Sequence, residues 1–584
     1  MAHFTVTSIK GHLYDSKYIC PYNEEDPVKS YDYNITKVLK NKEINIPKFL
    51  RYIAKGKDIL CLWTDCDPEG ENICYEIIRN VLPYMNKNYY QQVYRAIFSS
   101  LTEREIQKAF DGLREYPNCD LSMSIDARTI IDYKVGLSFS RLLTSNILNF
   151  IEENEISKKD VLSYGPCKTP ALWFCVQKKK EIDNFIPSIL YQIYVEIKDD
   201  NKYYKIYMDK QYKSKELAEK TLDYIQKDPY LKVIKISSRE FIEDSPKGLK
   251  TTTMLKKASS QLKMSPKEAS FTAEELYLKG YISYPRTSST KYSSNLYFKE
   301  NLNKLKSIFF GFYNEYYFKK DKDVQELIEN FIIENLNFDK GIEIEGHQPI
   351  TPTEYNSRIF LYNNQLELFN LICRHYFASL SPPLKYTIKQ YNMKVKDYTF
   401  IGKSSTITDK GFLKFEPSKE KEYISEFPSL KENDEFIIFN YGIEKKISEP
   451  PDFITEEELI DKMEAYNLGT NGTIPEHIHN LSLRGYIEVD QEKRRIIPTK
   501  LGIALIEALN KIEPDIIKPE NRKKIEDFVK EIELKKKSYK EALDNAIKFY
   551  KNKFINCFYK TDELRKEFGK YFKLKNIYIM KKIN

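Results

Sequence analysis

Two β-rich segments place the strongest constraint on how this chain of 584 residues can fold. Residues 190–245 and residues 384–443 contain runs rich in β-branched and aromatic side chains, among them YQIYVEI and DEFIIFNYG. The residues between them, 246–383, hold the most distinctive motif of the chain. We therefore predict that residues 246–383 are inserted into a β domain, and that this β domain acts as a hinge.

The motif inside the insertion is GYISYPRT, residues 280–287. Tyr284 precedes Pro285, whose ring disfavours a helical backbone at the residue before it, so the phenol lies on an extended segment. Arg286 carries a planar set of donors that matches a phosphate and keeps its charge. The motif predicts a covalent phosphotyrosine step. In a chain with 45 tyrosines and 25 prolines, however, Tyr-Pro-Arg alone can also be an ordinary turn.

The residues before this motif predict a packed helix. Ser265 to Glu268 form a capping box with Pro266 at the first helical position, and Gly280 ends the helix. Between them, small and apolar residues recur at helical spacing: Ala269, Thr272, Ala273 and Leu276. Tyr284 should therefore lie just beyond the end of this helix.

The N-terminal region predicts an α/β unit with a largely parallel sheet. Strands are expected at residues 3–8, 58–64 (buried) and 93–98, a helix at 71–82, and a second helix after the capping box 102–105. The inward face of that second helix should carry Ile106, Ala109, Phe110 and Leu113.

An acidic sequence, Asp65-Cys66-Asp67-Pro68-Glu69, follows the strand at 58–64. Ligands of open α/β sheets bind at the carboxyl ends of the strands. On an extended backbone Asp65, Asp67 and Glu69 would alternate and face one side, as oxygen ligands for Mg²⁺. The alternative is a solvated helix start, where acidic residues are common in any case.

Three further stretches are weaker candidates. A helical pattern carries Asp126, Arg128, Asp132 and Arg141, for which surface salt bridges are the usual explanation. A turn-rich loop at 163–170 would let a nucleic-acid strand approach Gly165, or is simply a linker. His347, in GHQPITPT (346–353), could donate to a phosphate or move a proton, although a lone histidine is usually structural.

The chain beyond residue 450 is predicted to be helical. A helix is expected at 456–466, another beginning at Thr473 and Pro475 with its N-terminus toward phosphate, and long amphipathic helices at 520–535 and 538–555.

Composition predicts several globular domains, because the chain is long and 41% of its residues are apolar. The net charge of +8 permits a polyanionic partner without requiring one. The nine cysteines form no C-x2-C pair, which argues against zinc sites and disulfides. No apolar run is long enough for a membrane span and no signal peptide is evident, so we expect a soluble protein inside the cell, without membrane contact.

Five sequence blocks together resemble the type IA DNA topoisomerases, and among them the topoisomerase III beta branch. In chain order the blocks are WTDCDPEGENIC, LSYGPCKTP, GYISYPRT, GHQPITPT and LGTNGTIPEHI. The resemblance spans about residues 7–490 and weakens toward 555.

The resemblance implies a multi-domain α/β plus α+β fold in which the domains form a toroid. Residues 1–145 would be a Toprim α/β domain that lacks its first strand. Residues 146–189 and 451–584 would be helical and bind the strand. Residues 190–245 and 384–450 would be the β-rich gate or hinge, and residues 246–383 the domain of the catalytic tyrosine.

It also implies roles for individual residues. Tyr284 matches the nucleophile that becomes linked to a 5′ phosphate, Arg286 the arginine that positions the phosphate, and His347 a histidine near the scissile phosphate. Asp65, Asp67 and Glu69 match the acidic Mg²⁺ triad. Residues matching the strand-binding blocks are Arg128, Asp132, Arg141, Ser163, Gly165, Lys168, Thr351, Thr353, Thr473 and His477.

The chain departs from the family pattern at several points. It begins after the position of the Ala-Glu-Lys-Pro-like block, whose glutamate serves metal binding and proton transfer, so we expect a truncated N-terminus or a lost carboxylate. Asn471 stands where aspartate is usual, Lys168 where glutamine is common, and Pro68 where a basic residue is usual. A zinc-finger or Arg-Gly-rich tail is also absent.

We therefore expect a Mg²⁺-dependent topoisomerase that cleaves and reseals single-stranded DNA without ATP, since no G-x4-G-K-[ST] loop is present. RNA stays open as a second substrate, and a scaffold or helicase protein as a partner. In a eukaryote the protein would act in the nucleus, otherwise in the cytoplasm. The alternative is a single-strand-binding subunit unable to cleave because the glutamate is missing. A Toprim nuclease is a weaker hypothesis, because it leaves Tyr284 without a role.

Overall fold

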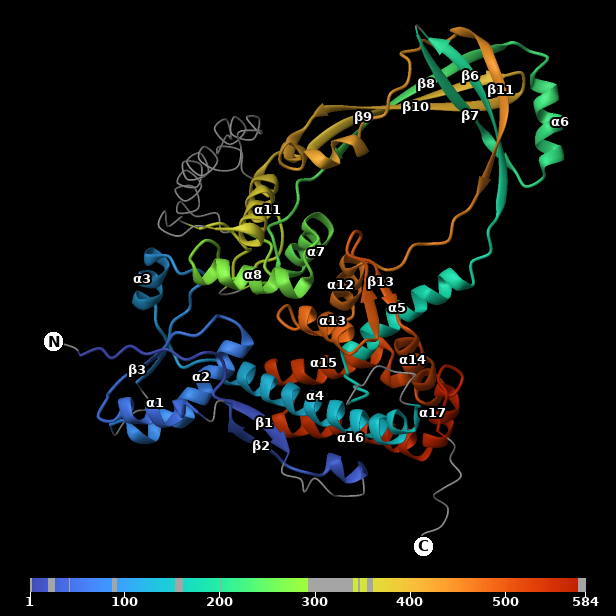
Figure 1. Ribbon diagram of the computed structural model, residues 1–584. Coiled ribbons are helices and arrows are strands. Elements are labelled where there is room, and N and C mark those ends of the chain that lie inside the picture. The colour runs from blue at the N-terminus through green and yellow to red at the C-terminus, as the bar shows by residue number, and fades with distance from the viewer. Residues whose placement is uncertain are drawn as a thin grey trace.

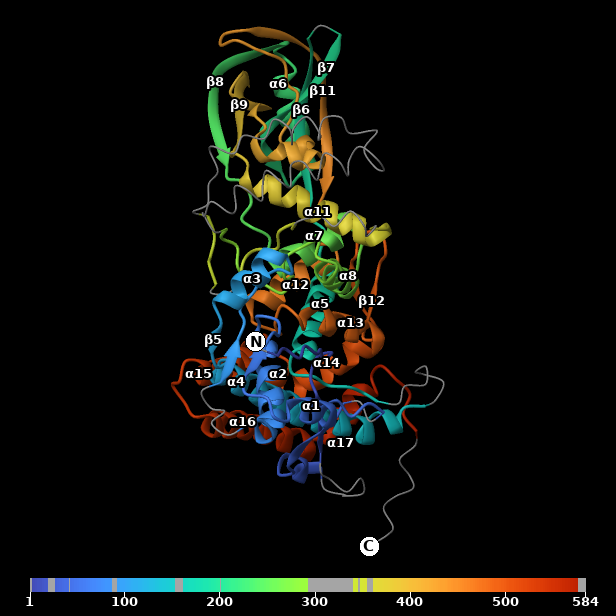
Figure 2. The same ribbon diagram turned by 90° about the vertical axis from the view of Figure 1, so that its left-hand side faces the viewer.

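The computed structural model describes residues 3–18, 27–40, 43–86, 92–152, 161–199, 201–292, 340–344, 347–353 and 361–575. Its elements follow one another around a ring, with a β barrel on one side and a mass of helices on the other (Figure 1). Turned by 90°, the barrel stands at one end of an elongated molecule (Figure 2). The multi-domain fold predicted from the sequence is confirmed.

The N-terminal region is built on a three-stranded sheet in the order β3-β4-β5. Strands β3 and β4 are parallel, whereas β4 and β5 are antiparallel. A separate antiparallel hairpin, β1-β2, precedes this sheet. The elements are β1 (Tyr14–Tyr18), β2 (Ile35–Leu39), α1 (Ile46–Ala54), β3 (Leu60–Leu62), α2 (Pro68–Val81), β4 (Val93–Arg95), α3 (Glu103–Asp111) and β5 (Arg114–Glu115).

Several sequence predictions for this region were wrong in detail. Residues 3–8 form no strand, and Phe4 and Val6 are 73% and 92% exposed, because no neighbouring strand pairs with them in the described part of the chain. The strand expected at 58–64 is shorter, and only Leu62 is buried in it, because β3 is an edge strand. The sheet is mixed rather than largely parallel.

The inward face predicted for α3 was also wrong at one position. Phe110 is 45% exposed, and its ring packs near those of Phe4 and Trp63, with centroids 6.4 and 6.5 Å away. Helical periodicity alone did not reveal that this edge of the helix faces outward.

Both β-rich segments contribute to one closed antiparallel barrel, in the order β10-β7-β6-β11-β8-β9. Its neighbouring strands β8 and β9 are separated in sequence by residues 244–383, which leave and re-enter the barrel at that point. The barrel has its own hydrophobic core, separate from that of the helices. Its elements are β6 (Ile189–Asp199), β7 (Lys202–Tyr212), α6 (Lys215–Ile225), β8 (Tyr230–Glu243), β9 (Leu384–Val395), β10 (Tyr398–Asp409) and β11 (Glu435–Ile447).

The segment between β8 and β9 contains α7 (Thr251–Leu262), α8 (Pro266–Leu278) and α11 (Asn363–Leu380). The predicted start of α8 is confirmed, because the Ser265 hydroxyl accepts a hydrogen bond from the Glu268 N–H at 3.2 Å. Gly280 follows the helix with φ +78°, a left-handed conformation that favours glycine. The chain then turns into the tyrosine motif.

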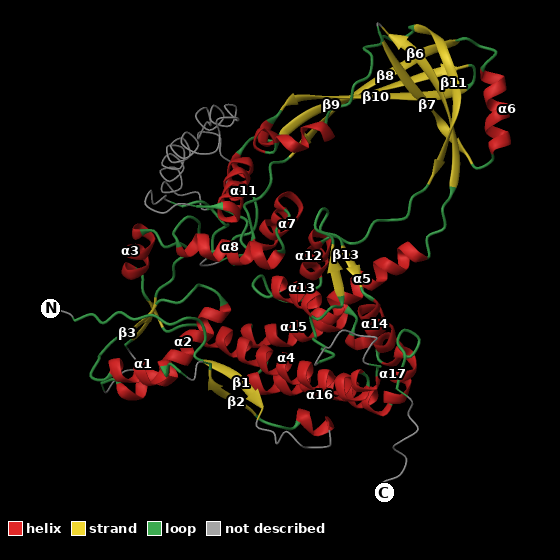
Figure 3. Cartoon of the chain, in the orientation of Figure 1, coloured by secondary structure: helices red, strands yellow, loops and turns green. Residues whose placement is uncertain are grey.

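The remaining helices pack around one large hydrophobic core, which continues into α7, α8 and α11 (Figure 3). They are α4 (Cys119–Asn146), α5 (Lys168–Asp183), α12 (Glu456–Ala465), α13 (Ile474–Leu483), α14 (Lys500–Ile512), α15 (Pro519–Glu533), α16 (Tyr539–Tyr559) and α17 (Thr561–Phe568), with a small hairpin of β12 (Ile487–Val489) and β13 (Ile496–Pro498). The short 3-10 helices are η1 (Pro27–Tyr31), η2 (Leu82–Tyr84), η4 (Leu148–Phe150), η6 (Gly411–Phe415), η7 (Pro417–Glu422) and η8 (Pro514–Ile516). The helices predicted beyond residue 450 are confirmed, including α13 with Thr473 as its N-cap. Across the described ranges, no helix has the length and apolar character needed to cross a membrane.

Candidate active site

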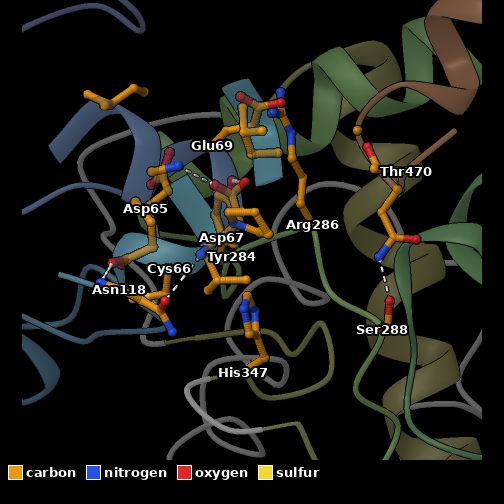
Figure 4. A pocket seen from close by; sticks show the side chains of 18 of the residues that line it. Asp65, Cys66, Asp67, Glu69, Asn118, Tyr284, Arg286, Ser288, His347 and Thr470 are labelled. Atoms are coloured by element: carbon orange, nitrogen blue, oxygen red, sulfur yellow. Dashed lines mark hydrogen bonds between the residues drawn. The ribbon is translucent and has the colours of Figure 1, made fainter. Parts of the chain in front are cut away.

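Tyr284 lies where the tyrosine motif meets the N-terminal sheet region (Figure 4). Its backbone N–H donates to the carbonyl oxygen of Ser99 at 2.8 Å. Its phenol donates to Oδ2 of Asp67 at 2.6 Å, and the side chain is 6% exposed. The motif and the acidic loop, far apart in sequence, thus meet at one hydrogen bond.

The acidic loop is held in place by contacts to its backbone. The guanidinium of Arg95 donates to the carbonyl oxygens of Thr64 and Asp65 at 2.7 and 2.8 Å. A Cβ at Gly70 would lie 1.9 Å from the carbonyl oxygen of Asp65, so only glycine fits there. These contacts fix the direction in which Asp65 and Asp67 point.

The three acidic residues line one cavity but have different partners, because the backbone changes conformation between Asp67 and Glu69. Asp67 is extended and caps α2, with Oδ1 accepting from the Gly70 N–H at 2.7 Å, whereas Glu69 is already in the first helical turn. Asp65 accepts a hydrogen bond from the Tyr277 hydroxyl at 3.3 Å. Glu69 instead pairs with Nε2 of His12 at 3.1 Å. The alternation expected for an extended segment therefore holds for Asp65 and Asp67 only.

Arg286 lies beside Tyr284 and forms an ion pair with Glu274 of α8. Its Nε is buried and has no hydrogen-bond partner. A Cβ at Gly472 would lie 3.3 Å from Nη1 of Arg286, so glycine allows the loop before α13 to approach the guanidinium closely. The arginine is held in position and still has donors to offer.

His347 lies below this group in Figure 4 and lines the same cavity. Burial lowers the pKa of its imidazole, and the nearby charge of Asp67 offsets that effect only in part. The ring is therefore neutral at pH 7, and one of its nitrogens can donate to a phosphate oxygen.

These side chains line a cavity of about 1350 Å³. It is enclosed by the acidic loop, the start of α4, the tyrosine motif and residues 464–474. The predicted residues that it brings together are Asp65, Asp67, Glu69, Arg128, Tyr284, Arg286, His347 and Thr473. The site therefore combines a buried phenol, two carboxylates and an arginine beside an open space.

Comparison with known proteins identifies the family. The model of the DNA topoisomerase family matches residues 117–544, and that of the Toprim domain matches residues 2–101. The chain belongs to the type IA DNA topoisomerases. Both halves of the site, the Toprim carboxylates and the tyrosine motif, fall within these matches.

Among its relatives are DNA topoisomerase 3-beta of Arabidopsis thaliana, 33% identical over 95% of this chain and 62% of the relative, and DNA topoisomerase 3-beta-1 of Homo sapiens, 32% identical over 94% and 63%. The chain thus spans less than two thirds of the length of these relatives. Among solved structures, the full-length topoisomerase I of Thermotoga maritima aligns with a TM-score of 0.70 and 24% identity, over 96% of this chain and 85% of that one. This likeness supports the fold.

Toprim domains are generally associated with divalent metal ions. In this topoisomerase chain the donors fit such an ion in chemistry, since Asp65 and Asp67 are carboxylates on one side of a cavity. Burial raises the pKa of Asp65 and the charge of Asp67 raises it further, whereas the Tyr277 hydrogen bond and the charge of Arg286 offset this only in part. Within the described ranges, however, no three acidic, histidine or cysteine side chains converge as metal ligands, because Glu69 is turned to His12.

The phenol of Tyr284 is strongly held in its protonated form. Burial raises its pKa, and the charges of Asp67 and Asp65 raise it further, outweighing the opposite effect of Arg286. Despite burial, the phenol and Glu274 raise the pKa of Arg286, which stays charged. The resting site thus holds its proton on the tyrosine and its positive charge on the arginine.

The other predicted residues, Arg128 excepted, do not line the cavity. Asp132 forms an ion pair with Arg522, a buried residue of α15, and Arg128 contacts Glu526 at 2.7 Å. The salt bridges expected from this pattern are present, but they are partly buried, because α15 covers this face of α4. Arg141 lies farther along α4 and is half-buried.

The loop at 163–170 is shorter than predicted, because α5 begins at Lys168. The Lys168 ammonium donates to the hydroxyl of buried Ser163, and its side chain packs against Gly165. Burial and the charge of Arg484 lower the pKa of Lys168 to about 8. Burial, with Arg522 and Lys168, lowers that of His477 to about 4.

Thr351 and Thr353 are buried against the tyrosine motif. The Thr351 N–H donates to the Ser283 hydroxyl at 2.9 Å, and the Thr353 hydroxyl donates to the carbonyl oxygen of Gly280. Gly346, in the same block, lies outside the described residues. The described part of this loop supports the backbone that carries Tyr284.

Sequence reasoning missed several residues of the cavity. Tyr277 and Glu274 lie on α8, before Tyr284, and a helical face toward the acidic loop was the only available signal. Asn471, noted only as a departure from the family pattern, donates from Nδ2 to the Ser288 hydroxyl at 2.7 Å. Glu464 of α12 also lines the cavity.

Proposed function

We propose that this chain carries out the type IA reaction, transient cleavage of a single strand through a 5′-phosphotyrosine. The observation that carries the proposal is the 2.6 Å hydrogen bond from the Tyr284 phenol to Asp67, beside Arg286. A tyrosine placed against a carboxylate base and next to a phosphate-binding arginine has the geometry of an activated nucleophile.

In the proposed step the phenol oxygen of Tyr284 attacks the phosphorus of a phosphodiester. A new P–O bond to tyrosine forms while the bond from phosphorus to the 3′ oxygen breaks. The phenol proton passes to Asp67, and the released 3′ oxygen takes up a proton. One phosphodiester replaces another of similar energy, so the reverse reaction reseals the strand without ATP.

Arg286 and His347 would act on the phosphate itself. Arg286 donates to Glu274 but keeps further N–H groups, which would pair with the non-bridging oxygens and stabilise the charge that builds up during attack. His347, neutral at pH 7, would donate to one of the same oxygens. Both side chains line the cavity into which the phosphate would enter.

We propose Mg²⁺ as the cofactor, held by Asp65 and Asp67, with Glu69 joining them when it leaves His12. Glu69 is free to do so because its side chain is 44% exposed. The bound ion would supply positive charge against the carboxylates and the phosphate. Mg²⁺ binding should change the fluorescence of Trp63, two residues before Asp65, in wild type and not in Asp65→Asn.

The proposed substrate is single-stranded DNA, with RNA as a second substrate, contacted by the ten predicted strand-binding residues named above. In the proposed domain division the barrel is a hinge, and residues 244–383 would swing away from the helical region. A second strand could then pass through the opening, which would relax negative supercoils and separate linked DNA. A scaffold or helicase protein would be the partner, and in a eukaryote the nucleus the site of action.

The test is to trap the intermediate. The chain is mixed with a labelled single-stranded oligonucleotide and Mg²⁺ and quenched with denaturant, with Tyr284→Phe in parallel. The proposal expects a covalent adduct in wild type and none in Tyr284→Phe. Binding of the oligonucleotide without any adduct would overturn it and leave the alternative, a strand-binding subunit.

A further inference from the structure

Helix α7, which belongs to the tyrosine segment, lies against α12 of the helical region (Figure 1). Both helices contribute buried apolar residues to the large core, and pairs of opposite charges also join them. Lys250, the N-cap of α7, pairs with Glu464, and Lys256 pairs with Asp461 at 2.6 Å. The Ser259 hydroxyl donates to Glu456 at 2.9 Å. If residues 244–383 swing away from the helical region as proposed, these contacts between α7 and α12 must break.

Glu464 differs from the other acidic residues of α12 because both of its oxygens bind the first turn of α7. Oε1 pairs with Lys250, and Oε2 accepts a hydrogen bond from the Thr252 hydroxyl at 3.1 Å. Thr252 is fully buried, whereas the Glu464 side chain is 35% exposed, so this bond is partly buried. Glu464 also lines the active-site cavity.

The residue between these two partners, Thr251, holds the backbone of the tyrosine motif. Its hydroxyl lies 2.6 Å from the carbonyl oxygen of Pro285 and accepts from the Thr287 N–H at 2.8 Å. Its own N–H donates to the carbonyl oxygen of Thr287 at 3.0 Å. Pro285 follows Tyr284 and Thr287 follows Arg286, so Thr251 sets the backbone on which both side chains stand.

We propose that Glu464 is a positioning residue for strand cleavage. From α12 it fixes the first turn of α7, and Thr251 in that turn fixes the tyrosine motif. Cleavage is then efficient only while α7 and α12 are in contact, which protects a strand from being cut when the ring is open. This inference rests on the proposed function and assigns one residue to the coupling between ring closure and chemistry.

A purely structural ion pair is the competing explanation, and the chain offers a matched control. Lys256 and Asp461 join the same two helices one turn away, but no hydrogen bond of theirs among those described reaches residues 284–287. Asp461→Asn and Glu464→Gln each remove one interhelical ion pair. Only Glu464→Gln removes the link to the first turn of α7.

The experiment measures single-turnover adduct formation on a short single-stranded oligonucleotide, which needs no strand passage, together with the dissociation constant of that oligonucleotide. Glu464→Gln should lower the cleavage rate on the order of tenfold while binding stays unchanged. Asp461→Asn should cleave at the wild-type rate. Equal cleavage rates in the two variants would overturn the proposal.

A second pair of variants keeps the test decisive if Glu464→Gln folds poorly. Thr251→Val should slow cleavage as Glu464→Gln does, and Thr251→Ser, which retains the hydroxyl, should keep most of the rate. Full activity of Thr251→Val would contradict the proposal. If wild type itself forms no adduct, the proposed function fails and this inference falls with it, whereas equal rates against an active wild type refute the inference alone.

Discussion

At the scale of single residues, the site depends on a hydrogen bond between side chains that are 217 positions apart in sequence. Asp67 has two tasks at once, since one carboxylate oxygen caps α2 and the other accepts from the Tyr284 phenol. The charge of that carboxylate is what makes it a base. A substitution that removes the charge of Asp67 but keeps its shape should abolish its role as a base and preserve its role as the cap of α2.

The Asp67→Asn variant should lower the rate of adduct formation by about 10²–10⁴-fold, because the phenol loses the base that takes its proton. Asparagine is an equally good N-cap, so the midpoint of thermal unfolding should stay close to wild type. Asp111→Asn, at the end of α3, is the matched control. Wild-type cleavage by Asp67→Asn would show that Asp67 is not the base.

At the scale of secondary-structure elements, local signals predicted well and distant contacts were missed. The capping residue Ser265 marked the start of α8, Pro475 marked the start of α13, and β-rich runs marked the barrel strands. Such signals depend on neighbours within a few residues. The exposure of Phe110 and the pairing of Asp132 with Arg522 depend on elements far away in sequence.

In the candidate site, too, local motifs were predicted from the sequence and contacts between distant elements were not. The tyrosine motif, its arginine and the acidic loop were evident from the sequence. The turn of Glu69 toward His12 was not, because it requires α2 to begin at Pro68. The ion pair of Arg286 with Glu274 likewise required knowing which face of α8 meets the motif.

The buried ion pairs between α4 and α15 should matter for stability. Arg522→Met should lower the free energy of unfolding by about 3 kcal/mol, because Asp132 loses its partner and Glu526 keeps only Arg128, in a partly buried environment. Urea unfolding measures the change. The exposed pair of Lys178 with Glu181 is the control, since Lys178→Ala should change stability by less than about 0.5 kcal/mol. If Arg522→Met and Lys178→Ala changed the free energy of unfolding equally, the ion pairs between α4 and α15 would not have the stabilising role proposed here.

Buried His375 on α11 should make the fold sensitive to acid. Burial and the charge of Lys257 lower its pKa, while the Lys247 carbonyl and Glu416 offset this only in part. The unfolded chain therefore binds the proton more readily, so stability is complete above about pH 6.5 and falls as the pH drops.

Between pH 7 and pH 5 wild type should lose about 2 kcal/mol more than His375→Gln, a difference that urea unfolding at the two pH values would measure. An identical loss in the two proteins would mean that His375 is not the group responsible.

At the scale of the whole molecule, the ring would have to open for one strand to pass another. The described contacts between the tyrosine segment and the loop before α13 include the bond from Asn471 to Ser288. This pair lies at the junction that the proposed opening separates. A covalent link there should block passage and leave the chemistry intact.

Ser288→Cys combined with Asn471→Cys, with exposed Cys61 and Cys119 replaced by serine, puts two thiols at positions whose native side chains are in contact, and mass spectrometry verifies their disulfide after oxidation. The oxidised protein should still form an adduct with an oligonucleotide but should not relax a negatively supercoiled plasmid. Reduction should restore relaxation. Relaxation by the oxidised, crosslinked protein would contradict opening at this junction.

We propose above that Tyr284 is the nucleophile and that it becomes linked to a 5′ phosphate. The most direct measurement is to digest the trapped adduct with protease and nuclease and to map the modified peptide by mass spectrometry. We predict a peptide containing Tyr284 that carries a nucleotide through its 5′ phosphate. A nucleotide on another residue, or one joined through its 3′ phosphate, would rule out Tyr284 as a nucleophile of this type.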